Sequence, residues 1–274
     1  MSRSDFSRLS AFIHSEYGIK LPIAKKIMLE SRLQKRLRTL GISKFGDYID
    51  YVFSDEGMTA ELVSMLDLVT TNKTDFFREP AHFEYLVDKV LPELMDRDGA
   101  GVTSSLRIWS AGCSSGEEPY TLTMVLSEFA EQHRRFEFTI LATDLSTAVL
   151  DKGRTGVYEA SKIEPVPLAS RRKYLLRSKD SGKKLVRVVP GLRELVTFKR
   201  LNLLAERYSV DVAQHIVFFR NVIIYFDRET QEKVITRVCR HLRQGGYLFV
   251  GHSETLFGMD VPLEQVAPTI YRRL

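Results

Sequence analysis

Two adjacent acids, Glu117 and Glu118, follow a glycine-rich turn at the start of an expected helix. They belong to the stretch LRIWSAGCSSGEEPYTLTMVL, which runs from Leu106 to Leu126. The residues LRIWS are short and apolar and predict a buried strand. Pro119 lies in the first helical turn, where a missing backbone N–H costs little. A strand, a glycine-rich turn and a helix open a nucleotide-binding α/β domain, because the turn admits a ligand and the helix N-terminus offers free N–H groups.

The charge of this turn indicates which ligand it suits. Three residues separate Gly112 from Gly116, so the G-x-G-x-x-G pattern of dinucleotide sites is not met, and no lysine follows Gly116 as a P-loop requires. Two carboxylates would repel a phosphate. They suit a ligand with a cationic head, such as the amino group of S-adenosylmethionine. The stretch is also compatible with an ordinary strand, turn and helix that bind no ligand.

Polar residues follow two further expected strands. The segment Glu137 to Thr143 predicts a strand ending on Asp144, which could bind both ribose hydroxyls of a nucleotide or could cap the helix that follows. The segment His215 to Phe226 predicts a buried strand interrupted by Arg220 and Asn221. In an open α/β sheet, polar residues at the carboxyl end of a strand face the ligand crevice.

A polar and aromatic loop, TTNKTDFFREPAHFEYL, precedes these strands at residues 70–86. Asn72 and Thr74 favour a loop or a helix cap, because their side chains compete for backbone hydrogen bonds. The two phenylalanines are expected to be buried, and Arg78 beside them to be partly enclosed with an anionic or polar partner. The alternative is an interdomain linker with a structural arginine.

A basic segment lies near the N-terminus. Between Lys20 and Lys44 there are eight basic residues and one acid, Glu30. On a helix ended by Gly41, one apolar stripe is formed by Leu29, Leu33, Leu37 and Leu40. The neighbouring face carries Lys25, Arg32, Lys35 and Arg36, with Arg38 further round. This face could be a docking surface for an acidic partner or simply a solvated face.

The expected organisation is an all-helical N-terminal domain over residues 1–70, a linker and interdomain helix over 71–95, and an α/β domain over 96–274. An antiparallel β insertion is expected at about 156–192, with a SKDSGK turn between two short strands, Tyr174–Leu176 and Leu185–Val189. Other expected elements are helices Thr59–Val69, Pro80–Met95, Thr147–Arg154 and Arg228–Leu242, a flexible surface loop Asp96–Ser105, and a terminal hairpin of Leu263–Val266 with Thr269–Leu274.

Composition restricts the class of protein. The chain has 274 residues, of which 44% are hydrophobic and 27% charged, as in soluble globular proteins. It has no apolar run of membrane-spanning length and no signal-peptide core, so we expect a cytoplasmic protein. Two cysteines give neither a disulfide framework nor a metal-ligand spacing. A net charge of +5 mildly favours an acidic partner, either nucleic acid or an acidic protein surface.

Together these motifs resemble the CheR family of chemotaxis receptor glutamate methyltransferases. The resemblance covers nearly the whole chain and keeps the family's order and spacing. It rests on TNKTDFFRE at 71–79, WSAGCSSGEEPY at 109–120, ATDLS at 142–146, LNLL at 201–204, FFRNVIIYFD at 218–227 and GHSETL at 251–256. It implies a Rossmann-like S-adenosylmethionine-dependent methyltransferase domain with a small antiparallel β subdomain inserted, preceded by an all-α domain.

The resemblance also implies residue roles. Asn72, Thr74 and Arg78 would contact S-adenosylmethionine from the interdomain loop, and the cofactor would lie in a crevice beside Gly112. The methionine end would meet Glu118, the ribose Asp144, and the adenine Asn202 and Leu203. Arg220 and Asn221 would close the site, and Tyr225 would lie near the transferred methyl. The products would be S-adenosylhomocysteine and a glutamyl methyl ester on the coiled-coil region of a receptor.

The chemistry agrees with these residue types. A glutamate carboxylate is ionised near pH 7, because its unperturbed pKa is about 4.3, so in-line methyl transfer needs no general base. We expect Arg78 and Tyr225 to position the reacting groups and expect no metal. The basic helix would dock the receptor, while binding of a receptor C-terminal tail peptide at the β insertion is left open.

Two alternatives remain at this point. The basic helix would suit a nucleic-acid methyltransferase, but aromatic residues do not interleave with the basic run and no D-P-P-Y-like motif is present, so we expect no nucleic acid partner. A non-catalytic S-adenosylmethionine-binding regulatory module is the other alternative. Turnover on a receptor would distinguish the enzyme from both.

Overall fold

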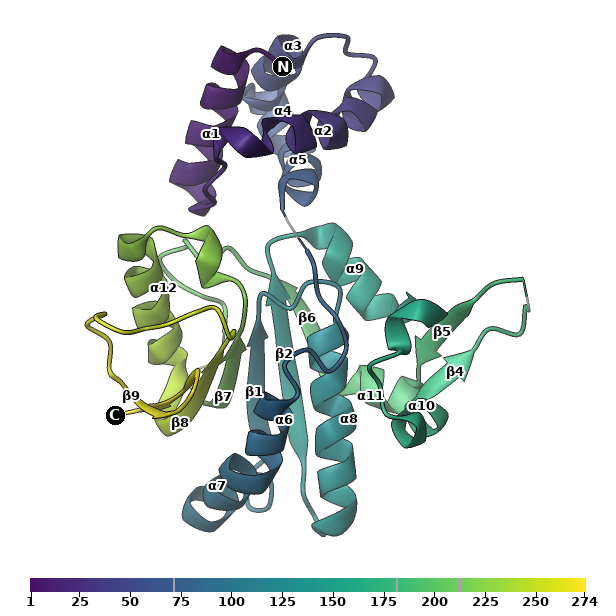
Figure 1. Cartoon of the computed structure of the whole chain (residues 1–274), viewed down its shortest axis with the longest axis vertical. Coiled ribbons are helices and arrows are strands. Elements are labelled where there is room, and N and C mark those ends of the chain that lie inside the picture. Colours follow the sequence, from purple (N-terminus) through teal and green to yellow (C-terminus); the bar gives the residue numbers. More distant parts are fainter. Residues whose placement is uncertain (71, 181, 211–212) are drawn as a thin grey trace.

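The computed structural model describes residues 1–70, 72–180, 182–210 and 213–274. Residue 71, which begins the motif at 71–79, and residue 181 of the SKDSGK turn lie outside the described residues. A helical domain stands above the carboxyl ends of a parallel sheet, and a small sheet projects from one side (Figure 1). Within the described part of the chain, none of the helices combines the length and hydropathy that crossing a lipid bilayer requires.

The N-terminal helices enclose a hydrophobic cluster of their own. They are α1 (Arg3–Tyr17), the 3₁₀ turn η1 (Ile23–Lys25), α2 (Lys26–Leu40), α3 (Phe45–Val52), α4 (Asp55–Ala60) and α5 (Leu62–Val69). Leu29, Leu33 and Leu37 of α2 are fully buried in this cluster, so the predicted leucine stripe is confirmed. Gly41 ends α2 with a left-handed backbone, as its position predicts.

The predicted helix Thr59–Val69 is confirmed over Leu62–Val69, but its start is wrong, because the chain breaks at Glu61 between α4 and α5. The Glu61 side chain is 1% exposed and accepts hydrogen bonds from Arg36 Nε at 2.7 Å and from the hydroxyl of Tyr48 at 2.9 Å. The break lets this carboxylate face inward, where a cation is its required partner.

The same contact corrects the predicted docking face of α2. Arg36 is committed to Glu61, and Arg32 donates from Nη1 to the carbonyls of Leu68 at 3.1 Å and Thr70 at 2.9 Å, which cap the end of α5. Both arginines therefore hold the domain together. Reversing either one to glutamate should therefore destabilise the fold.

The central sheet has the strand order β6-β2-β1-β7-β8-β10-β9, and its first five strands are parallel. These strands are β1 (Leu106–Ala111), β2 (Phe138–Asp144), β6 (Val196–Arg200), β7 (Gln214–Phe219) and β8 (Leu242–Val250). The antiparallel hairpin of β9 (Leu263–Ala267) and β10 (Ile270–Arg273) completes one edge, which confirms the predicted terminal hairpin. The connecting elements are α8 (Glu117–Gln132), α9 (Thr147–Thr155), α11 (Pro190–Glu194), the 3₁₀ turn η4 (Ile223–Tyr225) and α12 (Arg228–His241).

Alternation along β1 divides the core between the two faces of the sheet. Ile108 packs with residues of α8 on one face, and Trp109 packs with Val234 and Val238 of α12 on the other. Both strand residues are fully buried. The predicted fold class, a Rossmann-like α/β domain preceded by an all-α domain, is confirmed.

The segment between the two domains is more ordered than predicted. In place of one helix Pro80–Met95 it forms α6 (Ala81–Tyr85), the π-helical turn η2 (Leu86–Val90) and α7 (Leu91–Asp98). The predicted flexible loop after Asp96 is wrong, because Ala100 is fully buried and the Glu137 N–H donates to the Gly101 carbonyl at 2.8 Å. These contacts fix the approach to β1.

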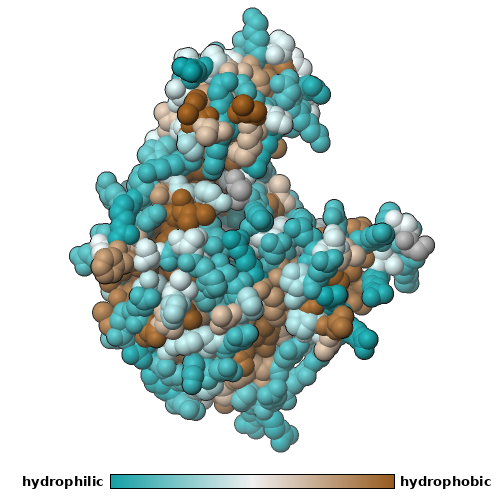
Figure 2. Space-filling view, viewed as in Figure 1, coloured by the Kyte–Doolittle hydropathy of each residue, from teal (hydrophilic) through white to brown (hydrophobic). Residues whose placement is uncertain are grey.

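The insertion is a three-stranded antiparallel sheet with the order β3-β5-β4. Its elements are β3 (Val157–Glu159), the 3₁₀ turn η3 (Ala160–Ile163), α10 (Leu168–Tyr174), β4 (Leu175–Arg177) and β5 (Leu185–Val188). The sequence predicted two of the three strands, and Tyr174 ends α10 rather than starting a strand. The space-filling view has a concave side between this insertion and the N-terminal helices (Figure 2).

The Arg36–Glu61 pair gives a stability prediction. Arg36→Ala should lower the free energy of unfolding by about 3–5 kcal/mol, because it leaves a carboxylate buried without its cation. Arg38→Ala is the matched control, since Arg38 is exposed on the same helix, and should change it by less than about 0.5 kcal/mol. Urea unfolding of both variants measures the difference, and equal stabilities would contradict the assignment.

Candidate active site

A cavity of about 290 Å³ lies at the carboxyl ends of β1, β2 and β7, beneath the N-terminal domain. This is close to the lower end of the range for small-molecule sites, about 300–1,000 Å³. Every residue predicted to bind the cofactor or to act in catalysis lines it, namely Asn72, Thr74, Arg78, Gly112, Glu118, Asp144, Asn202, Leu203, Arg220, Asn221 and Tyr225. The structure therefore brings these residues together, while their individual roles stay predictions.

The turn after β1 forms one wall of the cavity. Gly112 has φ +77°, and a Cβ added there would lie 2.4 Å from Val222 Cγ2, so only glycine fits. The Gly112 and Cys113 N–H groups both donate to the Thr143 carbonyl, at 2.7 and 2.9 Å. These bonds tie the ends of β1 and β2 together and place the turn beside Asp144.

Backbone N–H groups from the segments that follow β1 and β2 hold Asp144, and its contact with ribose stays a prediction. Its Oδ1 accepts from the Ser146 N–H at 3.0 Å, at the start of α9, and its Oδ2 accepts from the Ser114 N–H at 2.8 Å. Burial raises the pKa of the Asp144 carboxyl, and the backbone N–H groups oppose that shift. A carboxylate has about four acceptor sites, so two remain for ligand hydroxyls.

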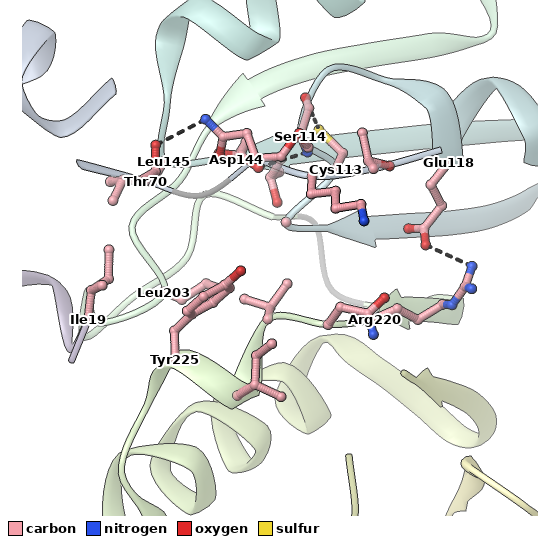
Figure 3. A pocket seen from close by; sticks show the side chains of 18 of the residues that line it. Ile19, Thr70, Cys113, Ser114, Glu118, Asp144, Leu145, Leu203, Arg220 and Tyr225 are labelled. Carbon is pink, nitrogen blue, oxygen red and sulfur yellow. Dashed lines mark hydrogen bonds and ion pairs between the residues drawn. The ribbon is translucent and has the colours of Figure 1, made fainter. Parts of the chain in front are cut away.

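Arg220 holds the other end of the cavity (Figure 3). Its guanidinium is 2% exposed and lies 2.9 Å from Glu79 Oε2 and 3.1 Å from Glu118 Oε2. The Glu118 Oε1 atom accepts from the Ser110 hydroxyl at 2.7 Å. Burial raises the pKa of Glu118 against the pull of Arg220. Burial also acts on Glu79, but Arg220 outweighs it and holds the pKa of Glu79 below its usual range.

The expectation that Arg78 is partly enclosed with an anionic or polar partner is confirmed, whereas the fully enclosed arginine of the site is Arg220. The Arg78 side chain is 36% exposed, and its Nη1 donates to the Lys73 carbonyl at 3.3 Å. Arg220 instead lies over the rings of Phe83 and Phe218, at 5.5 and 6.0 Å from their centroids. Arg78 thus keeps an accessible charge at the edge of the cavity.

The strand predicted over His215–Phe226 ends early. It stops at Phe219, and Arg220 and Asn221 lie beyond its carboxyl end in a loop that leads to η4. Asn221 has φ +59°, and its N–H donates to Glu254 Oε2 at 2.8 Å. The sequence motif GHSETL contains Glu254, but only the fold reveals that this buried carboxylate fixes the loop.

The N-terminal domain contributes lining residues that sequence reasoning missed. Tyr17, Ile19 and Leu21 line the cavity, and no local motif marks them, because their position depends on how the two domains pack. Lys25, predicted to dock substrate, also lines the cavity, with its Nζ 5.5 Å from the centroid of the Tyr225 ring. The Lys20 N–H donates to the Tyr225 carbonyl at 3.0 Å and joins the domains here.

Comparison with known proteins identifies the family. Residues 4–70 match the family model described as "CheR methyltransferase, all-alpha domain", and residues 72–272 match "CheR methyltransferase, SAM binding domain". The chain belongs to the CheR methyltransferase family. It is an S-adenosylmethionine-dependent methyltransferase. The cavity at the carboxyl ends of the strands has apolar walls and, at Asp144, acceptor positions for ligand hydroxyls, and this lining fits the cofactor.

Three relatives match over almost their whole length. A chemotaxis protein methyltransferase of Borreliella burgdorferi is 38% identical over 100% of this chain and 95% of that protein. The chemotaxis protein methyltransferase of Escherichia coli is 35% identical over 99% of this chain and 91% of that protein. Chemotaxis protein methyltransferase 2 of Pseudomonas aeruginosa is 35% identical over 98% of this chain and 93% of that protein.

The predicted contact between Asp144 and the ribose can be tested with a ligand that lacks the ribose hydroxyls. Asp144→Ala should weaken S-adenosylhomocysteine binding about tenfold to a hundredfold, since charge-assisted hydrogen bonds contribute roughly 1.5–3 kcal/mol each. In wild-type protein, an analogue without ribose hydroxyls should bind correspondingly more weakly, and in the variant this difference should vanish.

Calorimetry measures the affinities of wild type and Asp144→Ala for S-adenosylhomocysteine and for the analogue without ribose hydroxyls. Ser146→Ala is the control, because it removes the hydroxyl that accepts the Val149 N–H at the start of α9 and leaves Asp144 in place. If the variant and wild type distinguish the two ligands equally, Asp144 does not bind the ribose.

Proposed function

We propose that this methyltransferase acts in the cytoplasm on glutamate side chains of chemotaxis receptors and forms glutamyl methyl esters. The observation that carries the proposal is the charge at the edge of the cavity. Lys25, Lys73 and Arg78 line it with partly or fully exposed cationic side chains, whereas the acids Glu118 and Asp144 are bonded deeper inside. A carboxylate substrate is the acceptor that this arrangement attracts. The relatives named as chemotaxis methyltransferases support the choice of receptor.

The reaction needs alignment more than proton transfer. The bound cofactor supplies a methyl group on a cationic sulfur. The substrate carboxylate would accept this methyl group, and the cofactor would depart as its neutral thioether. None of the described residues that line the cavity is a histidine, which agrees with an acceptor that is already ionised. Arg78 and Tyr225 would orient the carboxylate, and the N-terminal domain would exclude water from above.

A direct assay tests this function. The full chain, radiolabelled S-adenosylmethionine and receptor-containing membranes should give label on the receptor that mild base releases as methanol, as an ester requires. Receptor whose methylation-region glutamates are replaced by alanine is the matched control and should stay unlabelled. Base-stable label, or label on RNA instead, would reject the proposal.

Arg78 and Tyr225 are predicted to act in turnover. Arg78→Ala and Tyr225→Phe should lower kcat roughly tenfold or more, because each removes a hydrogen-bond donor that orients the carboxylate, while affinity for S-adenosylhomocysteine should change little. Tyr247→Phe is the control, since Tyr247 of β8 donates to Glu93 of α7 and does not line the cavity. Wild-type rates in both variants would remove these residues from the mechanism.

The docking proposal for α2 now depends on its exposed charges. Lys35 and Arg38 are exposed, whereas Arg32 and Arg36 are committed to the fold and Lys25 to the cavity. Electrostatic attraction between this face and an acidic receptor helix would act mostly on encounter and register. A receptor tail peptide could in addition pair with an outer strand, β3 or β4, of the small sheet.

Charge reversal tests the docking face. Lys35→Glu with Arg38→Glu should cut the rate of methylation severalfold at limiting receptor and low salt, and the defect should shrink as salt screens the wild-type attraction. Lys89→Glu with Arg134→Glu is the control, because it makes the same change in net charge at exposed positions outside the N-terminal domain, one in η2 and one just after α8. Equal rates for the two double variants would favour a merely solvated face.

A further inference from the structure

Three potential metal ligands from distant parts of the chain lie close together next to Arg220. Glu79 comes from the interdomain loop, His82 from α6 and His252 from the loop after β8. One ligand atom from each lies within 4.8 Å of those of the other two. None of these three residues is among those that line the cofactor cavity.

Hydrogen bonds fix the state of the His82 ring. The Thr269 hydroxyl donates its single proton to the Pro268 carbonyl at 2.6 Å, so toward His82 Nε2, 2.8 Å away, it can only accept. Nε2 therefore carries a hydrogen. In a neutral ring Nδ1 then carries none.

This tautomer turns an acceptor toward a carboxylate. His82 is 2% exposed, and its Nδ1 atom is buried without a hydrogen-bond partner, 3.5 Å from Glu79 Oε2. Two acceptors facing each other in a buried place are unfavourable, and a cation between them would satisfy both. His252 Nε2 lies 4.0 Å from the same oxygen, and its side chain is 55% exposed, which leaves a path from solvent.

From this geometry we propose that Glu79, His82 and His252 bind a divalent transition-metal ion, Zn²⁺ by preference. Two imidazoles and one glutamate are a ligand set that holds zinc with a fourth position open. Tetrahedral ligands at zinc distances lie about 3.3–3.5 Å from one another. The distance from Glu79 Oε2 to His82 Nδ1 already fits at 3.5 Å, and that to His252 Nε2, at 4.0 Å, must shorten as the ion binds.

Of the residues around the proposed site, Thr269 would support metal binding and Arg220 would oppose it. Thr269 orients His82 as the outer partners of metal-bound histidines do. It adopts φ +59°, unusual for a β-branched residue, and this conformation directs its hydroxyl between His82 and Pro268. Arg220 shares Glu79 Oε2 and repels a cation, so the site favours a metal that bonds strongly to imidazole over Mg²⁺ or Ca²⁺.

Metal titration of the untagged, metal-free full chain tests the site. One equivalent of Co²⁺ should give the intense visible absorption of a four-coordinate ion, Zn²⁺ should displace it, and Zn²⁺ should raise Tm. His252→Ala should abolish the spectrum, and Thr269→Val should weaken Zn²⁺ binding about ten- to a hundredfold. His133→Ala is the control, because this histidine packs on Phe129 at the end of α8 and should bind as wild type.

Each contrary result overturns the proposal. Weak octahedral absorption, no saturable binding, or binding unchanged in both His252→Ala and Thr269→Val would mean that these residues do not form a metal site. His252 is exposed, so His252→Ala should keep the fold, and circular dichroism checks this. If that variant unfolds, Thr269→Val alone decides, since valine keeps the shape of threonine and removes only the hydroxyl.

Discussion

The buried guanidinium of Arg220 is the contact on which the site depends. It joins the end of β7 to Glu118 at the start of α8 and to Glu79 in the interdomain loop, and it also donates to the Arg78 carbonyl. A buried arginine with two carboxylates recovers its desolvation cost only when all its donors are used. Here one side chain sets the position of three segments, so the shape of the cavity follows from satisfying one charge.

The domain interface is built on the same principle of satisfied polar groups. Asn202 donates to the Glu16 carbonyl, and Asp67 accepts from the Thr147 hydroxyl and the Ala148 N–H at the start of α9. These bonds place α1 and α5 against loops at the carboxyl ends of the strands. The domains therefore share the cavity, and a substrate bound by the N-terminal helices would be held directly above the reacting centre.

Sequence was sufficient where a signal is local. The strand, turn and helix around Gly112 and the leucine stripe of α2 follow from periodicity and turn chemistry, and the motifs named eleven residues that line one cavity. The sequence did not predict contacts between side chains that lie far apart along the chain. Nothing near Arg36 in sequence reveals Glu61, and nothing near Arg78 reveals that Arg220 takes the buried position. Charge runs predict exposure only until folding supplies an opposite charge.

The Glu79 carboxylate connects the cavity to the proposed metal site. Its Oε2 atom serves Arg220 and also faces both histidines, while Oε1 accepts from the His252 N–H at 3.3 Å and the Asn221 side chain at 3.4 Å. A divalent ion and a guanidinium on one oxygen repel each other, so an ion would weaken the Arg220–Glu79 bond and leave Arg220 to Glu118. Any effect of the ion on the cofactor must be matched by an equal effect of the cofactor on the ion. Two sites that share one carboxylate are thus coupled by its charge, without a movement of either domain.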